Sequence, residues 1–222
     1  MSAVVCFDIR NFSMHVAHLL AYGEADRIFK LVEKIFACLD DAINACYEKI
    51  GVKDKTYVNH TGDGFVAIFY GKSKCLQGLL VASLVATGVK NLFDEYNEAT
   101  KDMPMHLDYG IGVHRGLIKK FNYHSEYPTS KLVGVGFLGH VINIASRVQE
   151  STKDHTFNLI CTKPVYDEVI SIISEKESKT IDECFFPLGR HKLPGIKRTY
   201  MLYGVRKYKV SASFPKKLKT ES

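Results

Sequence analysis

Two long segments of helical periodicity, each bracketed by short apolar runs, constrain the fold of this chain more than any other feature. Apolar residues recur every three to four positions from about residue 24 to 49, and again between Leu76 and Leu92. The short apolar or alternating runs that read as strands lie at 4–7, 56–60, 65–69 and 107–113. The order strand, helix, strand, strand, helix, strand predicts a ferredoxin-like βαββαβ sandwich of the α+β class. We expect the helices to cover one face of a single sheet.

The last third of the chain adds further elements to this plan. We expect a helix near 141–149, a strand at 157–161, a helix from Pro164 and two late strands around 184–188 and 200–205. A polar stretch at 119–131 interrupts the pattern and predicts a hairpin arm or a loop. One domain over 1–206, followed by a basic tail over 207–222, accounts for the whole chain.

Composition excludes several classes of protein. With 46% hydrophobic residues among 222, the chain can bury one sizeable core, and it has no apolar stretch of the length that a membrane span requires. No secretory signal is visible at the start, and the six unpaired-looking cysteines suit a reducing compartment, so we expect a cytoplasmic protein. The net charge of +6 owes much to lysines in the tail, which favours a solubilising terminus over a nucleic-acid partner.

Two aspartates stand at strand boundaries and are candidate metal ligands. Asp8 ends the run at 4–7, and Asp63 sits in the turn Gly62-Asp63-Gly64 just before the strand at 65–69. Two carboxylates at neighbouring strand ends could hold two divalent ions about 4 Å apart, as phosphoryl transfer requires. Each aspartate taken alone is more typical of an ordinary turn than of a metal site.

Two further groups of residues could complete such a site. The turn from Ile9 through Asn11 to Phe12 could cradle phosphates with its backbone N–H groups. Asn143 and Arg147 are four residues apart on the expected helix and project from one face. Arg147 could balance charge on an α-phosphate and Asn143 could hold a ribose, although an ordinary polar helix face has the same spacing.

Five ordered motifs, taken together, resemble the class III nucleotidyl cyclases. They cover almost the whole chain: Phe7-Asp8-Ile9-Arg10-Asn11-Phe12-Ser13, Thr61-Gly62-Asp63-Gly64, the run 109–116, the run 139–147, and the closing segment 188–200. The resemblance implies a head-to-tail homodimer with composite sites. Asp8, Asp63 and the Ile9 carbonyl of one subunit would bind two Mg²⁺ or Mn²⁺ ions, and Asn143 and Arg147 would come from the other.

The chain departs from the family where relatives read the base. Asn59 stands where adenylyl cyclases have a lysine, and Gly136 where they have an aspartate or threonine; the guanylyl-cyclase residues are absent too. An asparagine amide could hydrogen-bond to the edge of a uracil or cytosine base. The bulk of Tyr57 or Phe137 could make the base pocket too short for a purine. Alternatively, Asn59 arose by neutral drift and has no role in recognition, and backbone groups hold the base.

A second departure concerns the phosphates. Pro194 stands where many relatives have a phosphate-binding lysine, and Lys197, Lys192 or Arg190 could substitute for it.

A compact cyclase without either purine-reading pair resembles the pyrimidine cyclases of bacterial Pycsar anti-phage systems. That resemblance implies cyclic UMP, or else cyclic CMP, as a messenger for a separate effector protein. The alternatives are an adenylyl or guanylyl cyclase with an unusual base pocket, and a non-catalytic cyclase-homology module that binds nucleotide.

Overall fold

The structure is a computed structural model that describes residues 1–51, 56–103, 105–124, 133–173 and 183–206. The strands are β1 (Ser2–Arg10), β2 (Thr56–His60), β3 (Phe65–Phe69), β4 (Asp108–Gly116), β5 (Lys119–His124), β6 (Val133–Leu138), β7 (Leu159–Thr162), β8 (Phe185–Lys192) and β9 (Thr199–Val205). The helices are α1 (Phe12–Ala21), α2 (Asp26–Ile50), α3 (Lys74–Ala99), α4 (His140–Ser151) and α5 (Lys163–Ile172), with a 3₁₀ turn η1 (Thr152–Asp154) directly after α4.

Seven strands form one mixed sheet in the order β2-β3-β1-β4-β7-β9-β8. Strand β1 lies between β3 and β4 and pairs antiparallel with both, whereas β4 and β7 are parallel. The first six residues of β1, from Ser2 to Phe7, are buried because neighbouring strands and helices cover both of its faces. This buried strand, which continues to Arg10, therefore holds Asp8 in a fixed position.

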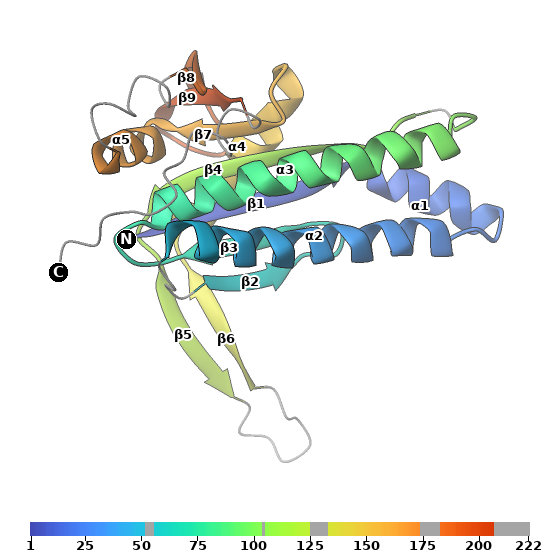
Figure 1. Cartoon of the computed structure of the whole chain (residues 1–222), viewed down its shortest axis with the longest axis horizontal. Coiled ribbons are helices and arrows are strands. Elements are labelled where there is room, and N and C mark those ends of the chain that lie inside the picture. The colour runs from blue at the N-terminus through green and yellow to red at the C-terminus, as the bar shows by residue number, and fades with distance from the viewer. Residues whose placement is uncertain (52–55, 104, 125–132, 174–182, 207–222) are drawn as a thin grey trace.

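Helices cover both faces of the sheet. The long helices α2 and α3 lie side by side along one face (Figure 1), where their apolar stripes join the main core together with α5. Helix α4 lies on the opposite face, where Val141 and Ala145 pack on Val4, Cys6 and Ile68. The expectation that helices cover one face is correct for the long helices and wrong for α4. The reason is that the strand side chains on the face opposite the main core are apolar as well, and α4 covers them.

Helix α1 was not expected, because the sequence analysis assigned only a turn after Asp8. Its ten residues, FSMHVAHLLA, include no Asp, Glu, Lys or Arg, so they lack the polar face by which periodicity marks a surface helix. The helix ends near Gly23, which has a φ of 72°. The predicted turn after Asp8 is therefore followed by a helix over residues 12–21.

Strands β5 and β6 form a separate two-stranded arm that projects from the body (Figure 1). The hairpin expected at 119–131 is correct for 119–124, which pairs with 133–138. Residues 125–131 and the tail at 207–222 lie outside the described residues.

Helix α3 is the one helix of the described residues that is long and apolar enough to cross a membrane. Most of its apolar window, 67%, is buried inside the fold, as in the core helix of a globular domain.

Candidate active site

Asp8 lies inside β1, two residues before its end rather than at the end as predicted, and Asp63 lies in the turn two residues before β3. In the antiparallel register of β1 and β3, Phe7 is opposite Phe65, so the chain segments that bear the two carboxylates run beside each other. Gly64 makes this approach possible, because a Cβ there would lie 2.3 Å from the Phe7 carbonyl oxygen. Gly62 adopts a φ of 86°, a conformation that favours glycine. The two glycines thus explain why this turn holds Asp63 against Asp8.

The two carboxylates share a partly buried, electronegative position. Burial raises the pKa of Asp8, and the charge of Asp63 raises it further, while Lys153 and Arg10 lower it. Burial also raises the pKa of Asp63. A divalent cation would relieve this desolvation and repulsion, so the pair has the chemistry of a cation site.

The donor set fits Mg²⁺ or Mn²⁺. These ions prefer carboxylate and carbonyl oxygens, and Mg²⁺ is commonly held by one or two carboxylates plus substrate phosphates and water. Asp8 and Asp63 supply the carboxylates, and the Ile9 carbonyl follows directly in the chain. Among the described residues no group of three or more His, Cys, Asp or Glu side chains could hold a metal. The remaining ligands would therefore come from nucleotide and water.

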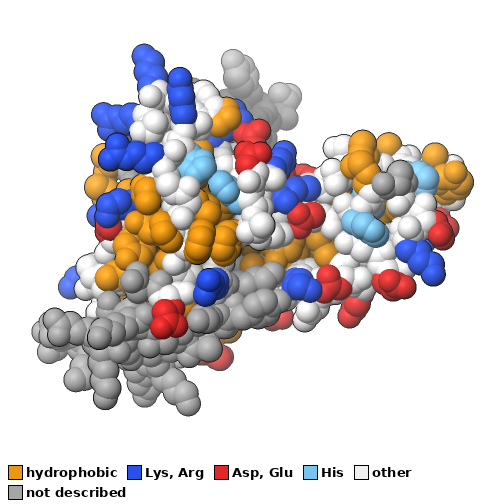
Figure 2. Space-filling view, turned by 90° about the horizontal axis from the view of Figure 1, so that it is seen from above, with side chains coloured by type: hydrophobic (Ala, Val, Ile, Leu, Met, Phe, Trp, Pro, Cys, Tyr) orange, Lys and Arg blue, Asp and Glu red, His pale blue; other side chains and the backbone are white. Residues whose placement is uncertain are grey.

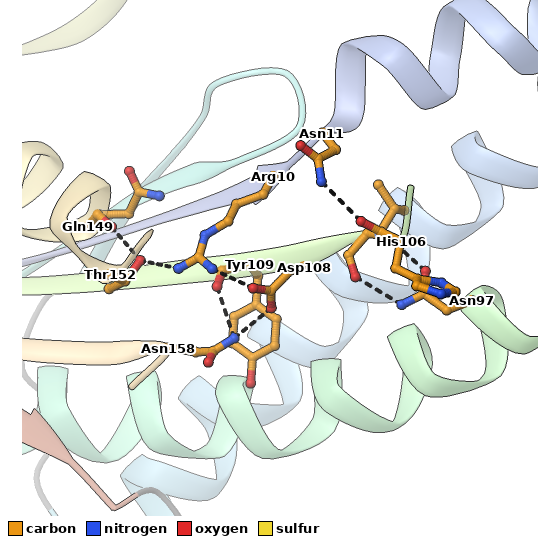
Figure 3. Close-up of polar contacts among 10 residues, drawn as sticks. Arg10, Asn11, Asn97, His106, Asp108, Tyr109, Gln149, Thr152 and Asn158 are labelled. Atoms are coloured by element: carbon orange, nitrogen blue, oxygen red, sulfur yellow. Dashed lines mark hydrogen bonds and ion pairs between the residues drawn. The ribbon is translucent and has the colours of Figure 1, made fainter. Parts of the chain in front are cut away.

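The segment after Asp8 presents the N-terminus of α1. Asn11 has a φ of 64° and precedes Phe12, the first residue of the helix. Its side-chain Nδ2 donates to the His106 carbonyl oxygen at 3.0 Å, which fixes the turn (Figure 3). The first N–H groups of a helix have no partner within it and favour anions. The predicted phosphate contacts at Asn11 and Phe12 are thus placed at a helix start.

Asn143 and Arg147 lie on the outer face of α4, away from the sheet. Both side chains are exposed, whereas Ala145 and Val148, on the inner face, are fully buried. Arg147 Nη1 donates to Glu150 Oε2 at 2.6 Å, an exposed pair on the same helix. Exposed pairs of this kind stabilise a protein by at most about 1 kcal/mol, so a phosphate could replace Glu150 at little cost.

The predicted base-binding residues come together between β2 and the arm. The Tyr57 ring lies 5.2 Å from the Phe137 ring and 5.8 Å from the Tyr70 ring, between ring centroids. Lys120 Nζ donates to the Tyr57 hydroxyl at 2.7 Å. Asn59 is exposed two residues after Tyr57 on β2, so it shares that face of the sheet.

Gly136 has a steric reason to be glycine. It is opposite Phe121 in the arm, and a Cβ there would lie 2.3 Å from the tip of the Phe121 ring. The sequence gives no sign that Phe121, Lys120 and Tyr70 lie here, because residues on separate strands carry no local signal of their contact.

Pro194 stands where many relatives have a phosphate-binding lysine. The basic residues that could take over that role here lie in and around the turn between β8 and β9. An open hollow of about 440 Å³ is lined by residues 192–197, including Lys192 and Lys197. Both lysines are exposed, as is Arg190 on β8. No described contact joins this hollow to Asp8 and Asp63 within one chain, so the assignment of Lys197 to phosphate stays a prediction.

Comparison with known proteins identifies the fold. No protein-family profile matches the sequence. A curated relative, the adenylate cyclase of Anabaena cylindrica, is 28% identical over 167 residues, which is 74% of this chain and 30% of that protein. The chain therefore spans less than a third of that relative's length.

Solved cyclase domains superpose on nearly the whole chain. A bacterial light-regulated adenylyl cyclase matches with a TM-score of 0.66 at 20% identity, covering 96% of this chain and 95% of that one. The adenylyl cyclase CyaB from P. aeruginosa matches at 0.64 and 16% identity, covering 92% of each chain. The guanylyl cyclase Cya2 matches at 0.67 and 14%, covering 92% and 90%. The chain has the fold of these class III cyclase domains, which confirms the expected α+β plan.

Proposed function

We propose that this chain is a nucleotidyl cyclase, which converts a nucleoside triphosphate to its 3′,5′-cyclic monophosphate and pyrophosphate. The observation that carries the proposal is the pair Asp8 and Asp63, held near each other where the pairing of β1 with β3 ends, within a fold shared with adenylyl and guanylyl cyclases. The similarity to an Anabaena adenylate cyclase supports the same activity.

Each candidate side chain has a role in that reaction. Asp8, Asp63 and the Ile9 carbonyl would hold two Mg²⁺ or Mn²⁺ ions, and such ions would supply positive charge to the phosphates and acidity to the ribose 3′-hydroxyl. The ribose 3′-hydroxyl would lose its proton to water, and its oxygen would bond to the α-phosphorus as the bond from that phosphorus to pyrophosphate breaks. Asn143 holds the ribose, Arg147 balances charge on the α-phosphate, and the start of α1 with Lys197 contacts the outer phosphates.

A head-to-tail homodimer completes the site in this proposal. Asn143 and Arg147 point away from their own sheet and are available to a second chain. Beside the start of α4, Leu117 and Leu138 are 72% and 70% exposed. Figure 2 shows apolar side chains exposed among Lys and Arg on the side of the molecule that carries α4, β8 and β9. Exposed apolar patches of this kind mark protein interfaces.

We further propose UTP as the favoured substrate and CTP as the second. The rings of Tyr57, Phe137 and Tyr70 pack together, and Asn59 on the same strand as Tyr57 offers both a donor and an acceptor to a pyrimidine edge. The product would then serve as a cytoplasmic messenger for a separate effector in anti-phage defence. An adenylyl or guanylyl cyclase with an unusual pocket is the alternative that stays closest to the named relatives.

A four-nucleotide assay tests both levels of the proposal. The pure protein is incubated with ATP, GTP, UTP or CTP and Mn²⁺, and the products are separated by chromatography. We expect cyclic UMP as the main product, with Arg147→Ala and Asp63→Ala lowering the rate at least about 100-fold. Cyclic AMP or GMP as the main product would refute the pyrimidine preference alone. No cyclic product with any nucleotide, from folded protein, would favour the non-catalytic module.

A further inference from the structure

A network of polar side chains joins the end of β1 to the end of α4 (Figure 3). Arg10, two residues after Asp8, uses one guanidinium nitrogen for Asp108 on β4 and the other, Nη2, for Thr152 Oγ1 at 2.5 Å. Thr152 directly follows α4, and its Oγ1 donates to the Gln149 carbonyl oxygen at 2.6 Å. One arginine thus holds both a neighbouring strand and the C-terminal end of the helix that bears Arg147.

The network is anchored on the far side of Asp108. Asn158, just before β7, donates from Nδ2 to Asp108 Oδ1 at 2.7 Å and to the Tyr109 carbonyl oxygen at 3.1 Å. The Arg10 side chain is only 15% exposed. The Arg10 guanidinium is rigid and planar, and it donates to two separate acceptors, Asp108 and Thr152. Its orientation is therefore well defined.

The backbone brings α4 unusually close to the position of Asp8. In the β1–β4 register Asp8 is opposite Gly110, and a Cβ on Gly110 would lie 2.2 Å from Thr152 Oγ1. Gly112 is equally tight, because a Cβ there would lie 2.3 Å from the Ala145 carbonyl oxygen. Thr152 therefore fills the space of a missing side chain directly across from the candidate metal ligand.

We propose that Arg10 is a positioning residue, and that its contact with Thr152 links the strand end bearing Asp8 to the helix bearing Arg147. The inference rests on the proposed function. In the proposed dimer, Asp8 and Arg147 of one chain serve different active sites. The link would therefore set the metal geometry of one site and the placement of Arg147 in the other. A purely structural role for the network would affect stability alone.

Mixed dimers separate these two roles. Two differently tagged chains are co-expressed, and the dimer that carries both tags is purified. One chain carries Asp63→Ala, so that only the site with the other chain's Asp8 and Asp63 can turn over, and the Asp63→Ala chain supplies Arg147 to it. Thr152→Val, which removes the hydroxyl and keeps the shape, is then placed in either chain, and rates are measured against Mn²⁺ concentration.

The position of the substitution decides the expected result. In the chain that supplies the metal ligands, Thr152→Val should raise the Mn²⁺ concentration for half-maximal rate about tenfold, as loss of a residue supporting a metal ligand commonly does. In the chain that supplies Arg147, it should lower kcat and leave the Mn²⁺ requirement unchanged. The same change from both chains, or only a lower Tm, would overturn the proposal.

A binding measurement without turnover keeps the two proposals distinguishable. Mn²⁺ binding to the homodimer, followed by electron paramagnetic resonance of free Mn²⁺, should weaken about tenfold in Thr152→Val and in Arg10→Lys, which keeps the charge but loses the fork. The matched control is Thr162→Val, because Thr162 is also buried and its Oγ1 contacts His114 Nδ1 at 2.8 Å, outside the network. Wild-type Mn²⁺ affinity in both network variants would refute the link. A weakened affinity in a protein that makes no cyclic nucleotide would refute only the proposed activity.

Discussion

Two partly buried carboxylates lower the stability of the folded protein when no cation is bound between them. Burial raises the pKa of both Asp8 and Asp63, and the charge of Asp63 adds to the effect at Asp8. A raised folded-state pKa means that the protonated group favours folding. This contribution is complete below the unfolded value, about 4 for aspartate, and is lost as pH rises through the folded pKa. At neutral pH without metal, the pair therefore opposes folding.

Asp63→Asn should consequently stabilise the metal-free protein while it removes activity. We expect a Tm above that of the wild type at pH 7, by up to about 2–4 °C, with the difference shrinking as pH falls through the raised pKa of Asp63 and absent below about pH 4. Mn²⁺ should raise the Tm of the wild type and not that of the variant, because only a bound ligand stabilises the fold. Thermal unfolding with chelator and with Mn²⁺ measures both.

Asp94→Asn is the matched control, since Asp94 is exposed and pairs with Lys90 on the surface of α3. Its Tm should respond to Mn²⁺ as the wild type does. An Asp63→Asn variant less stable than the wild type in chelator at pH 7 would contradict the electrostatic account.

At the scale of elements, the contact between α4 and β4 depends on glycine. Gly110 and Gly112 carry no side chains where α4 and η1 press on the strand, and helix backbone occupies the space of a Cβ on Gly112. Backbone cannot rotate away as a side chain can. Any side chain at Gly112 must therefore displace the helix that carries Asn143 and Arg147.

Gly112→Ala tests this packing. We expect a loss of about 1–3 kcal/mol in unfolding free energy, as in overpacked cores, with a larger proportional loss of cyclase rate in the protein that remains folded. Gly78→Ala on α3 is the control, because its added methyl would lie no nearer than 3.3 Å to its neighbours, the Phe69 and Val5 side chains, and would not meet backbone. It should change stability by no more than about 1 kcal/mol and leave the rate unchanged. Chemical denaturation and product formation at a temperature where both variants are folded distinguish the two.

These elements also show where sequence reasoning reaches its limit. Periodicity predicted α2, α3 and the alternating strand β4 because each has one apolar face, and it placed Asn143 and Arg147 on a helix, where the structure has them. Asp8, predicted at the end of its strand, lies two residues inside it. It missed α1, which lacks a polar face of charged residues, and the side of the sheet on which α4 lies. Contacts such as Arg10 with Thr152 join residues 142 positions apart, and only the folded register reveals them.

For the whole molecule, the decisive question is whether one chain holds a complete site. Asp8 and Asp63 lie where the pairing of β1 with β3 ends. The side chains of Asn143 and Arg147, in contrast, are exposed on the outer face of α4. The exposed Leu117 and Leu138 lie beside that helix and offer an apolar surface for a second copy. A symmetric dimer would then contain two sites, each with metal ligands from one chain and Arg147 from the other.

Complementation between two inactive chains follows from that arrangement. An Asp63→Ala chain lacks a metal ligand and an Arg147→Ala chain lacks the charge-balancing arginine, so each homodimer should be inactive. In their mixed dimer, one site combines intact Asp8 and Asp63 with an intact Arg147, while the other carries both defects. Random mixing places about half of the chains in mixed dimers, and each mixed dimer has one working site out of two. About a quarter of wild-type activity should therefore return. Activity is measured after the two chains are refolded together, with each refolded alone as the control. A mixture as inactive as its components would show that Asp63 and Arg147 do not serve a site shared between two chains.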